Sequence, residues 1–444
     1  MHEDLVTAVE QLFPSVVTTL EELIRIPSVS AADFDAEHVH HSAEAVANAL
    51  HIAGLENVRL LEIPDAHPAV FGQVPGPSGA PTVLLYAHHD VQPPGPEGQW
   101  TGNPFEPEVR EGRLYGRGSS DDKAGFALHL GALLAHDGAP PVGVKVFVEG
   151  EEEIGSLHLD ELLASHRDLL VADVIVIADS ENWRLGTPAL TTSLRGLVDC
   201  VVEVRTLEHG VHSGGFGGAV PDALTCLVRL LATLHDDEGD VAVAGLVRGD
   251  AELLDMSEDE LRANAGVLEG TVLIGTGPLT SRMWARPACS VLAIDAPPVA
   301  KAINQLVPAA RAKVSLRIAP GDDPARAMDA LVAHLESHAP WGAWVSVTRG
   351  TAADAIALDA VGPAHDAFRE GLAAAWGREP VHIGVGGSIP IVAAFREAFP
   401  EAAILLTGVS DPASRPHGPD ESLDLGELQK GILAEAIALR LLAS

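Results

Sequence analysis

A chain of 444 residues is longer than one hydrophobic core usually supports, so two domains are expected. Hydrophobic residues make up 47% of the chain and aromatic residues only 4%, which predicts a globular protein with an aliphatic core. The net charge of −35 would repel nucleic acid and anionic lipid, so neither is expected as a partner.

The first residues and the cysteines bear on location. Acidic residues occur early in the chain where an export signal would need a basic start and an apolar run, and no stretch of about 18 apolar residues is present. Cys200, Cys226 and Cys289 lack the spacing of a disulfide framework or a thiolate metal site. We therefore expect a cytoplasmic protein without a membrane span, in which the cysteines are small core residues.

From Pro81 onward, short aliphatic runs alternate with segments of helical periodicity. Such runs predict parallel strands that are buried on both faces, with the helices as right-handed crossovers. The expected fold class is α/β, an open, mostly parallel sheet with helices on both faces. The predicted strands are 83–87, 142–148, 174–178 and 403–407, and the predicted helices are 124–136 and 425–442.

The middle of the chain has a different pattern. Apolar and polar residues alternate in 197–204, 313–318 and 344–349, and helical spacing occurs in 222–234 and 325–338. This predicts an antiparallel sheet with helices on one face. The segment 248–270 is polar and is expected to be loop and short helix. We predict a smaller α+β domain, 196–354, inserted into a catalytic domain formed by 1–195 and 355–444.

Polar residues with metal-binding chemistry follow the predicted strands. His88 and Asp90 come directly after strand 83–87, and the strand period of two places them on the same side. His88 could then bind a metal while Asp90 orients its ring. His89 would point away but remains a rival ligand, and a purely structural histidine is the alternative.

Two adjacent acids, Asp121 and Asp122, stand between a glycine-rich turn and the helix that begins at Ala124. One of them could bridge two metals. Alternatively, both could cap the N-terminus of the helix and interact favourably with the helix dipole.

A second acidic cluster, Glu149 and Glu151–Glu153, follows strand 142–148. A solvated turn would explain it, and so would a cation at the carboxyl edge of the sheet. Asp179 follows strand 174–178, and His417 lies beyond strand 403–407. Five strand-end positions thus offer the imidazole and carboxylate ligands that zinc accepts.

With these motifs, the chain resembles the M20 metallopeptidase family, in particular its carnosinase-like dipeptidase branch. The resemblance implies that His88 and Asp179 hold one metal, Glu153 and His417 the other, and that Asp121 bridges both. It also implies two non-ligand catalytic acids, Asp90 and Glu152, of which Glu152 would activate the metal-bridging water. Glu151 could exchange roles with its neighbours if the alignment slipped by one residue.

Further positions match the family in the middle domain and beyond. His212, in a glycine-rich segment, resembles the histidine that reaches across a dimer to stabilise the oxyanion. Arg317 resembles the arginine that binds the substrate carboxylate. Gly387 and Ser388 resemble a loop that contacts the same carboxylate, although a plain turn is the alternative.

Within the resemblance, Asp179 favours a dipeptidase because the carboxypeptidases and deacylases of the family tend to have Glu there. We expect a homodimer, formed through the inserted lid domain, with two divalent ions, zinc or else manganese or cobalt, acting on a small peptide substrate. An N-acyl amino-acid deacylase is the alternative enzyme. A non-catalytic metal-binding or amino-acid-binding module would not need Glu152, and chelator-sensitive amide hydrolysis would exclude it.

Overall fold

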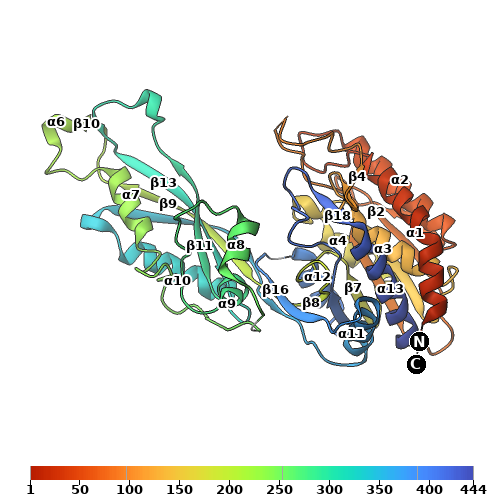
Figure 1. Ribbon diagram of the computed structural model, residues 1–444. Coiled ribbons are helices and arrows are strands. Elements are labelled where there is room, and N and C mark those ends of the chain that lie inside the picture. Colours follow the sequence, from red (N-terminus) through yellow and green to blue (C-terminus); the bar gives the residue numbers. More distant parts are fainter. Residues whose placement is uncertain (1, 97, 253, 388, 444) are drawn as a thin grey trace. The chain divides into compact units, whose positions relative to one another are not determined.

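The computed structural model describes residues 2–96, 98–252, 254–387 and 389–443. The chain forms two compact units (Figure 1). The first comprises Met1–Thr192, Leu358–Ile383 and Pro390–Ser444, and the second comprises Ser193–Ala357 and Gly384–Ile389. Each unit has a hydrophobic core of its own. Gly384–Ile389, which the sequence analysis assigned to the catalytic domain, groups with the second unit.

The main sheet of the first unit has four parallel strands at its centre, in the order β6-β3-β7-β17. Antiparallel strands extend it on both sides, with β2 and β1 beyond β6, and β8 beyond β17. The short strands β15 and β16 pair with β8. The strands are β1 (Glu56–Leu61), β2 (Ala69–Val74), β3 (Thr82–His88), β6 (Gly143–Glu149), β7 (Val174–Ile177), β8 (Ala189–Leu194), β15 (Ile356–Ala357), β16 (Val381–Val385) and β17 (Ala403–Leu406).

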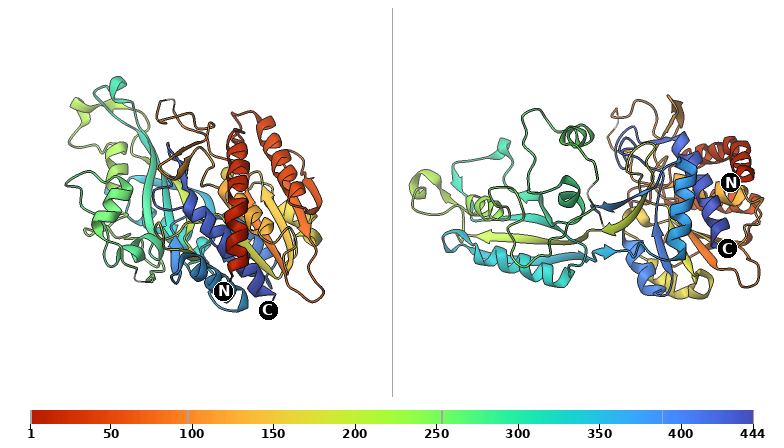
Figure 2. Two further views of the ribbon diagram at one scale, coloured as in Figure 1. Left: turned by 45° about the vertical axis from the view of Figure 1, so that its right-hand side comes forward. Right: turned by 60° about the horizontal axis from the view of Figure 1, so that its bottom comes forward.

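Helices cover both faces of this sheet because side chains alternate along each strand. Val83, Leu85 and Ala87 of β3 join a core with α1, α3 and α13, whereas the Tyr86 ring packs edge-on against Phe395 of α12. The helices α1 and α13 pack together, so both ends of the chain lie side by side (Figures 1 and 2). The helices of this unit are α1 (Glu3–Ile24), α2 (Ala36–Ile52), α3 (Lys123–Leu134), α4 (Leu159–Ser165), α5 (Arg167–Leu170), α11 (Pro363–Trp376), α12 (Pro390–Ala398) and α13 (Leu425–Leu442), with a 3-10 turn η1 (Glu152–Ile154).

A small antiparallel sheet, β18-β5-β4, joins residues 108–115 to residues 422–424. Its strands are β4 (Glu108–Arg110), β5 (Arg113–Tyr115) and β18 (Ser422–Asp424). Ser422 pairs with Tyr115, so the segment before α3 is bound to the segment before α13.

The second unit has an antiparallel sheet in the order β11-β13-β9-β14. Its apolar residues alternate, and helices α7 and α10 cover one face. The elements of this unit are β9 (Gly196–Arg205), β10 (Val211–His212), α6 (Ser213–Phe216), α7 (Ala223–Ala232), α8 (Glu258–Ala265), α9 (Leu279–Trp284), β11 (Ala288–Asp295), η2 (Val299–Lys301), β12 (Gln305–Leu306), β13 (Ala309–Ile318), α10 (Pro324–Ser337), η3 (Pro340–Gly342) and β14 (Trp344–Ala353).

The predicted α/β fold class is confirmed, with parallel strands at the centre of the main sheet and antiparallel strands at its flanks. Each predicted strand and helix corresponds to an observed one, although the bounds shift by a few residues. The three cysteines are buried and free, in agreement with their expected place in the core. None of the helices in the described part of the chain has the length and apolar character that a bilayer span requires.

Candidate metal centre

The first candidate ligand stands at the carboxyl end of β3. His88 is the last residue of this strand and is fully buried. Its Nε2 lies 3.0 Å from Oδ1 of Asp121, while its Nδ1 lies 3.1 Å from the backbone oxygen and 3.4 Å from Oδ1 of Asp90. Asp90 therefore contacts Nδ1 of His88, whereas Asp121 lies at Nε2. A residue that orients a metal-binding imidazole occupies the same position as Asp90.

Asp90 is in turn held by two donors. The Ser30 hydroxyl donates to Asp90 Oδ2 at 2.7 Å, and the backbone N–H of Glu153 donates to the same oxygen at 3.1 Å. Burial by itself would raise the pKa of Asp90, but contacts with His88 and Ser30 outweigh it and lower the pKa. The carboxylate is therefore ionised, and it ties β3 to the turn that carries Glu153.

The carboxylate of Asp121 lies between two histidines. Its Oδ1 is 3.0 Å from His88 Nε2, and its Oδ2 is 3.0 Å from His417 Nε2. The next residue, Asp122, is the N-cap of α3: its Oδ1 accepts a hydrogen bond from Gly125 N at 3.2 Å. Asp121 thus faces the histidines, whereas Asp122 occupies the capping position.

Glu153 and His417 complete the second half of the cluster. His417 Nε2 lies 3.1 Å from Glu153 Oε2, and the imidazole is 57% exposed whereas the Glu153 side chain is 3% exposed. Gln92 holds both oxygens of Glu153: its backbone N–H donates to Oε1 at 3.0 Å, and its side-chain amide donates to Oε2 at 2.9 Å. The sequence pattern did not predict a role for Gln92.

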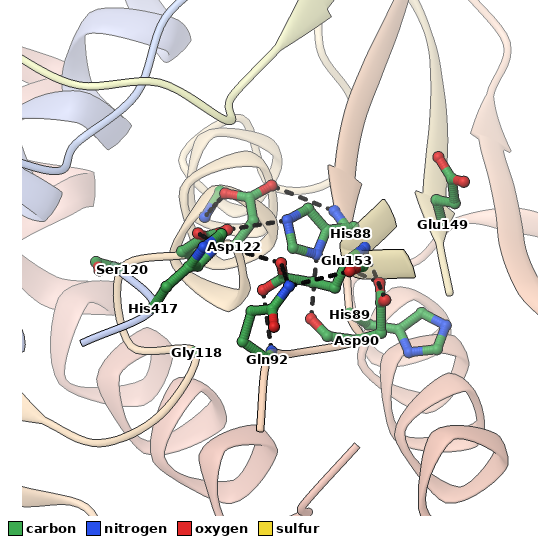
Figure 3. A network of polar contacts seen from close by, with 12 residues as sticks. His88, His89, Asp90, Gln92, Gly118, Ser120, Asp122, Glu149, Glu153 and His417 are labelled. Carbon is green, nitrogen blue, oxygen red and sulfur yellow. Dashed lines mark hydrogen bonds and ion pairs between the residues drawn. The ribbon is translucent and has the colours of Figure 1, made fainter. Parts of the chain in front are cut away.

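Within the described part of the chain, two sets of side chains can each offer ligand atoms that lie within 4.8 Å of one another. Asp179, which follows β7, belongs to the set with His88. All five predicted ligands thus gather at the carboxyl ends of the central strands, and Figure 3 shows His88, Glu153 and His417 directed toward one another. The first set is His88, Asp122 and Asp179. The second set is Asp121, Glu153 and His417.

Two neighbours of the candidate ligands, His89 and Glu151, are engaged elsewhere. The His89 ring points away from the cluster in Figure 3, and its Nε2 lies 2.9 Å from the backbone oxygen of Pro68. Burial lowers the pKa of His89 to about 4, so the ring is neutral. Glu151 accepts a hydrogen bond from His67 N at 2.9 Å and lies 2.9 Å from Nδ1 of His158.

Buried carboxylates crowd together in the cluster and raise the pKa of some of its members. Burial is the main reason that the pKa of Glu152 rises to about 7; the carboxylates of Glu153 and Asp90 add to it, against the effect of His88. Burial, followed by Asp121, also raises the pKa of Asp179 well above its ordinary value. Carboxylates crowded in this way are stable as anions beside cations. The donor set of imidazole and carboxylate fits divalent ions such as zinc.

The other predicted residues belong to the second unit. His212 is exposed at the end of β10, and its Nδ1 accepts a hydrogen bond from Gly214 N at 3.1 Å. A side chain at Gly387 would meet no atom within 4 Å, so its backbone is open on that side. Ser388 lies outside the described residues.

Arg317, in β13, is partly buried, and its side chain makes no hydrogen bond or ion pair with the described residues. It stands opposite Leu197 of β9, so Arg195, two residues before Leu197, lies on the same face. Arg195 Nε donates to the backbone oxygen of Gly386 at 3.2 Å. Burial, and then the charge of Arg317, lower the pKa of Arg195 to about 10. Arg195 thus contacts Gly386, and the charge of Arg317 lies near that of Arg195. Neither guanidinium has a carboxylate partner among the described residues, an arrangement suited to an anion.

Comparison with known proteins gives the family of the chain. Residues 84–440 match the model of peptidase family M20/M25/M40. The cysteinylglycine-S-conjugate dipeptidase of Corynebacterium striatum is 36% identical over 94% of this chain and 93% of its own length. The Cys-Gly metallodipeptidase DUG1 of Candida albicans is 27% identical over 97% and 95%. The fold is similar to that of human carnosine dipeptidase 1, with a TM-score of 0.81 and 24% identity over 99% of this chain and 98% of that one.

The chain belongs to peptidase family M20/M25/M40 and is a metallopeptidase. Its relatives are named as dipeptidases, so the predicted membership of the dipeptidase branch is confirmed. The alternative of an N-acyl amino-acid deacylase is not favoured by these relatives.

Proposed function

We propose that this protein hydrolyses the amide bond of dipeptides that have a free carboxylate, using two zinc ions, with manganese or cobalt as alternatives. The observation that carries the proposal is the position of Asp121, whose two oxygens each lie 3.0 Å from a different histidine. In the proposed assignment, His88 and Asp179 would hold one ion, Glu153 and His417 would hold the other, and Asp121 would serve as a ligand shared by both.

When bound, the two ions would lower the pKa of a water molecule and polarise the scissile carbonyl. Glu152 acts as the general base that takes the proton of this water and later gives it to the leaving amine. The hydrogen bond from Glu153 N to Asp90 fixes the turn that presents Glu152. Asp90 keeps the His88 ring in a constant orientation throughout.

The substrate's carboxylate is proposed to bind Arg317, with the open backbone of Gly387 and the hydroxyl of Ser388 as further donors. The partly buried Arg317 side chain, which has no acceptor among the described residues, supports this role. Arg195 adds positive charge and holds Gly386 through its backbone oxygen. A planar guanidinium suits the two oxygens of a carboxylate.

A homodimer formed through the second unit is also proposed, with His212 of one protomer stabilising the oxyanion in the other. Strand β11 is an edge strand, and its Val291, Leu292 and Ile294 are exposed by 41%, 60% and 43%. Exposed apolar residues on an edge strand are typical of an interface. Sedimentation velocity should give a dimer for the native chain, and a monomer for Leu292→Lys.

A cytoplasmic location is proposed from the three buried, unpaired cysteines, which are typical of a reducing compartment.

The proposed activity is tested with a panel of dipeptides and a panel of N-acetyl amino acids, with and without a chelator. The dipeptides include cysteinylglycine and β-alanyl-histidine, which correspond to names of relatives. Metal content is measured on the same sample. Chelator-sensitive turnover of dipeptides is expected. Turnover of the N-acetyl panel alone would favour a deacylase, and metal binding without any turnover would favour a binding module.

A further inference from the structure

Glu421 is a fully buried carboxylate close to the metal centre that no step of the proposed reaction uses. It stands four residues after His417 and immediately before β18. Five donors converge on it. Arg117 Nη1 and Gly118 N donate to Oε2 at 2.6 and 3.0 Å, and Ser120 N, Ser120 Oγ and Asp121 N donate to Oε1 at 2.9, 2.9 and 3.1 Å.

The donors all come from one loop, which ends at the carboxylate that faces both histidines. Gly118 adopts a left-handed φ of +81°, and its N–H is one of the donors. The backbone oxygen of Glu421 also accepts a hydrogen bond from Gly116 N at 3.1 Å. Glu421 thus binds the loop that carries Asp121 to the segment that carries His417, although these two segments are almost 300 residues apart in the sequence.

The Arg117–Glu421 pair is buried as a unit, with exposures of 1% and 0%. Arg117 also donates to the backbone oxygen of Pro93 at 3.2 Å, next to Gln92, which holds Glu153. The pair therefore contacts three segments, each of which contains or adjoins a candidate metal ligand. A pair placed in this way can set the spacing between these ligands.

We propose that Glu421 is a positioning residue for the metal centre: it fixes Asp121 relative to His417 so that both metal positions have their ligands preassembled. This inference rests on the proposed metal-ligand assignment. Residues that orient metal ligands typically change metal affinity by about 10- to 100-fold when they are replaced. A buried residue that served stability alone would lower the unfolding temperature without this change.

The test variant is Glu421→Gln, which retains the shape of the side chain. The amide would direct an N–H₂ group at Arg117 or at the Ser120 and Asp121 donors, so at least one side of the network must break. The matched control is Glu435→Gln. Glu435 is also buried and paired with a cationic partner, His129, but it lies within α13 and contacts none of the candidate ligands.

Each variant is stripped of metal and titrated with Zn²⁺ by calorimetry, and with Co²⁺ by visible absorption, in the absence of substrate. Glu421→Gln is expected to bind metal about 10- to 100-fold more weakly and to show an altered Co²⁺ spectrum. Glu435→Gln is expected to match the native protein in both measurements. Native affinity and spectrum in Glu421→Gln would overturn the inference.

If Glu421→Gln does not fold, Ser120→Ala decides instead, because it removes one of the five donors and leaves the carboxylate charge in place. Its metal affinity is expected to fall about fivefold, as for the loss of one hydrogen bond, and an unchanged affinity would overturn the inference. These measurements need no turnover. Native protein that binds two metals but cleaves no dipeptide would contradict the proposed function alone.

Discussion

Gln92 holds the carboxylate of Glu153 at both oxygens, through its backbone N–H at 3.0 Å and its side-chain amide at 2.9 Å. Replacing Gln92 by Ala removes the donor to Oε2, the oxygen that also faces His417. We expect the affinity for one metal equivalent to fall about tenfold, measured by titration of the metal-free protein. Gln73→Ala, in β2, is the control. Two equivalents bound with native affinity would show that Glu153 needs no such support.

The second prediction concerns Glu152. Glu152→Gln should retain both metals and lose turnover by about 10²- to 10⁴-fold, because the amide cannot accept the proton of the water. Glu151→Gln is the matched control, since its carboxylate faces His67 and His158 rather than the cluster. The measurements are kcat and metal content. If Glu151→Gln were the variant that lost turnover, the base would be the neighbouring residue.

The third prediction separates the adjacent histidines. His88→Gln should lose at least one bound metal, whereas His89→Gln should retain two, because His89 contacts Pro68 and points away from the cluster. Elemental analysis after dialysis gives the metal content of each variant. The reverse pattern would move the ligand to His89.

The fourth prediction concerns pH and stability at a buried pair, His129 and Glu435, that is not part of the candidate ligand set. His129 Nδ1 lies 2.9 Å from both oxygens of Glu435, and its Nε2 lies 2.9 Å from the backbone oxygen of Tyr86. Burial alone would lower the pKa of His129, but Glu435 and then the Tyr86 oxygen outweigh it and raise the pKa. Because the folded-state pKa is raised, this pair stabilises the protein fully below the unfolded pKa of about 6.5, and the stabilisation is lost as the pH rises through the folded-state value.

Glu435→Gln should therefore cost about 3 kcal/mol of unfolding free energy at pH 6, as for breaking a buried pair. The difference from the native protein should shrink toward pH 10. Urea unfolding in the presence of a chelator measures this difference in unfolding free energy without the contribution of bound metal. A difference that is constant across this range would mean that His129 does not titrate in it.

The strands that carry the site could be predicted from the sequence because each is a short aliphatic run, and a parallel sheet brings their carboxyl ends to one edge. His88 and Asp90 followed from this, since they adjoin β3. The choice of Glu152 and Glu153 over Glu151 came from the resemblance. The structure adds that the Glu151 carboxylate faces His67 and His158.

Residues that support the ligands could not be predicted in the same way. Ser30 and Glu421 reach Asp90 and Asp121 from segments far away in the sequence, and nothing in their local pattern marks them. Gln92 lies only two residues after Asp90, but a glutamine at that position has no distinctive spacing that marks it. Arg195, which immediately precedes β9, became notable only when the structure brought its charge near that of Arg317.

The most direct test of the central claim is anomalous-difference crystallography on the zinc-loaded protein. Two peaks about 3.5–4 Å apart are expected, one beside His88 and Asp179, the other beside Glu153 and His417, with Asp121 in contact with both. A single peak, or peaks that are not bound by these five side chains, would contradict the account.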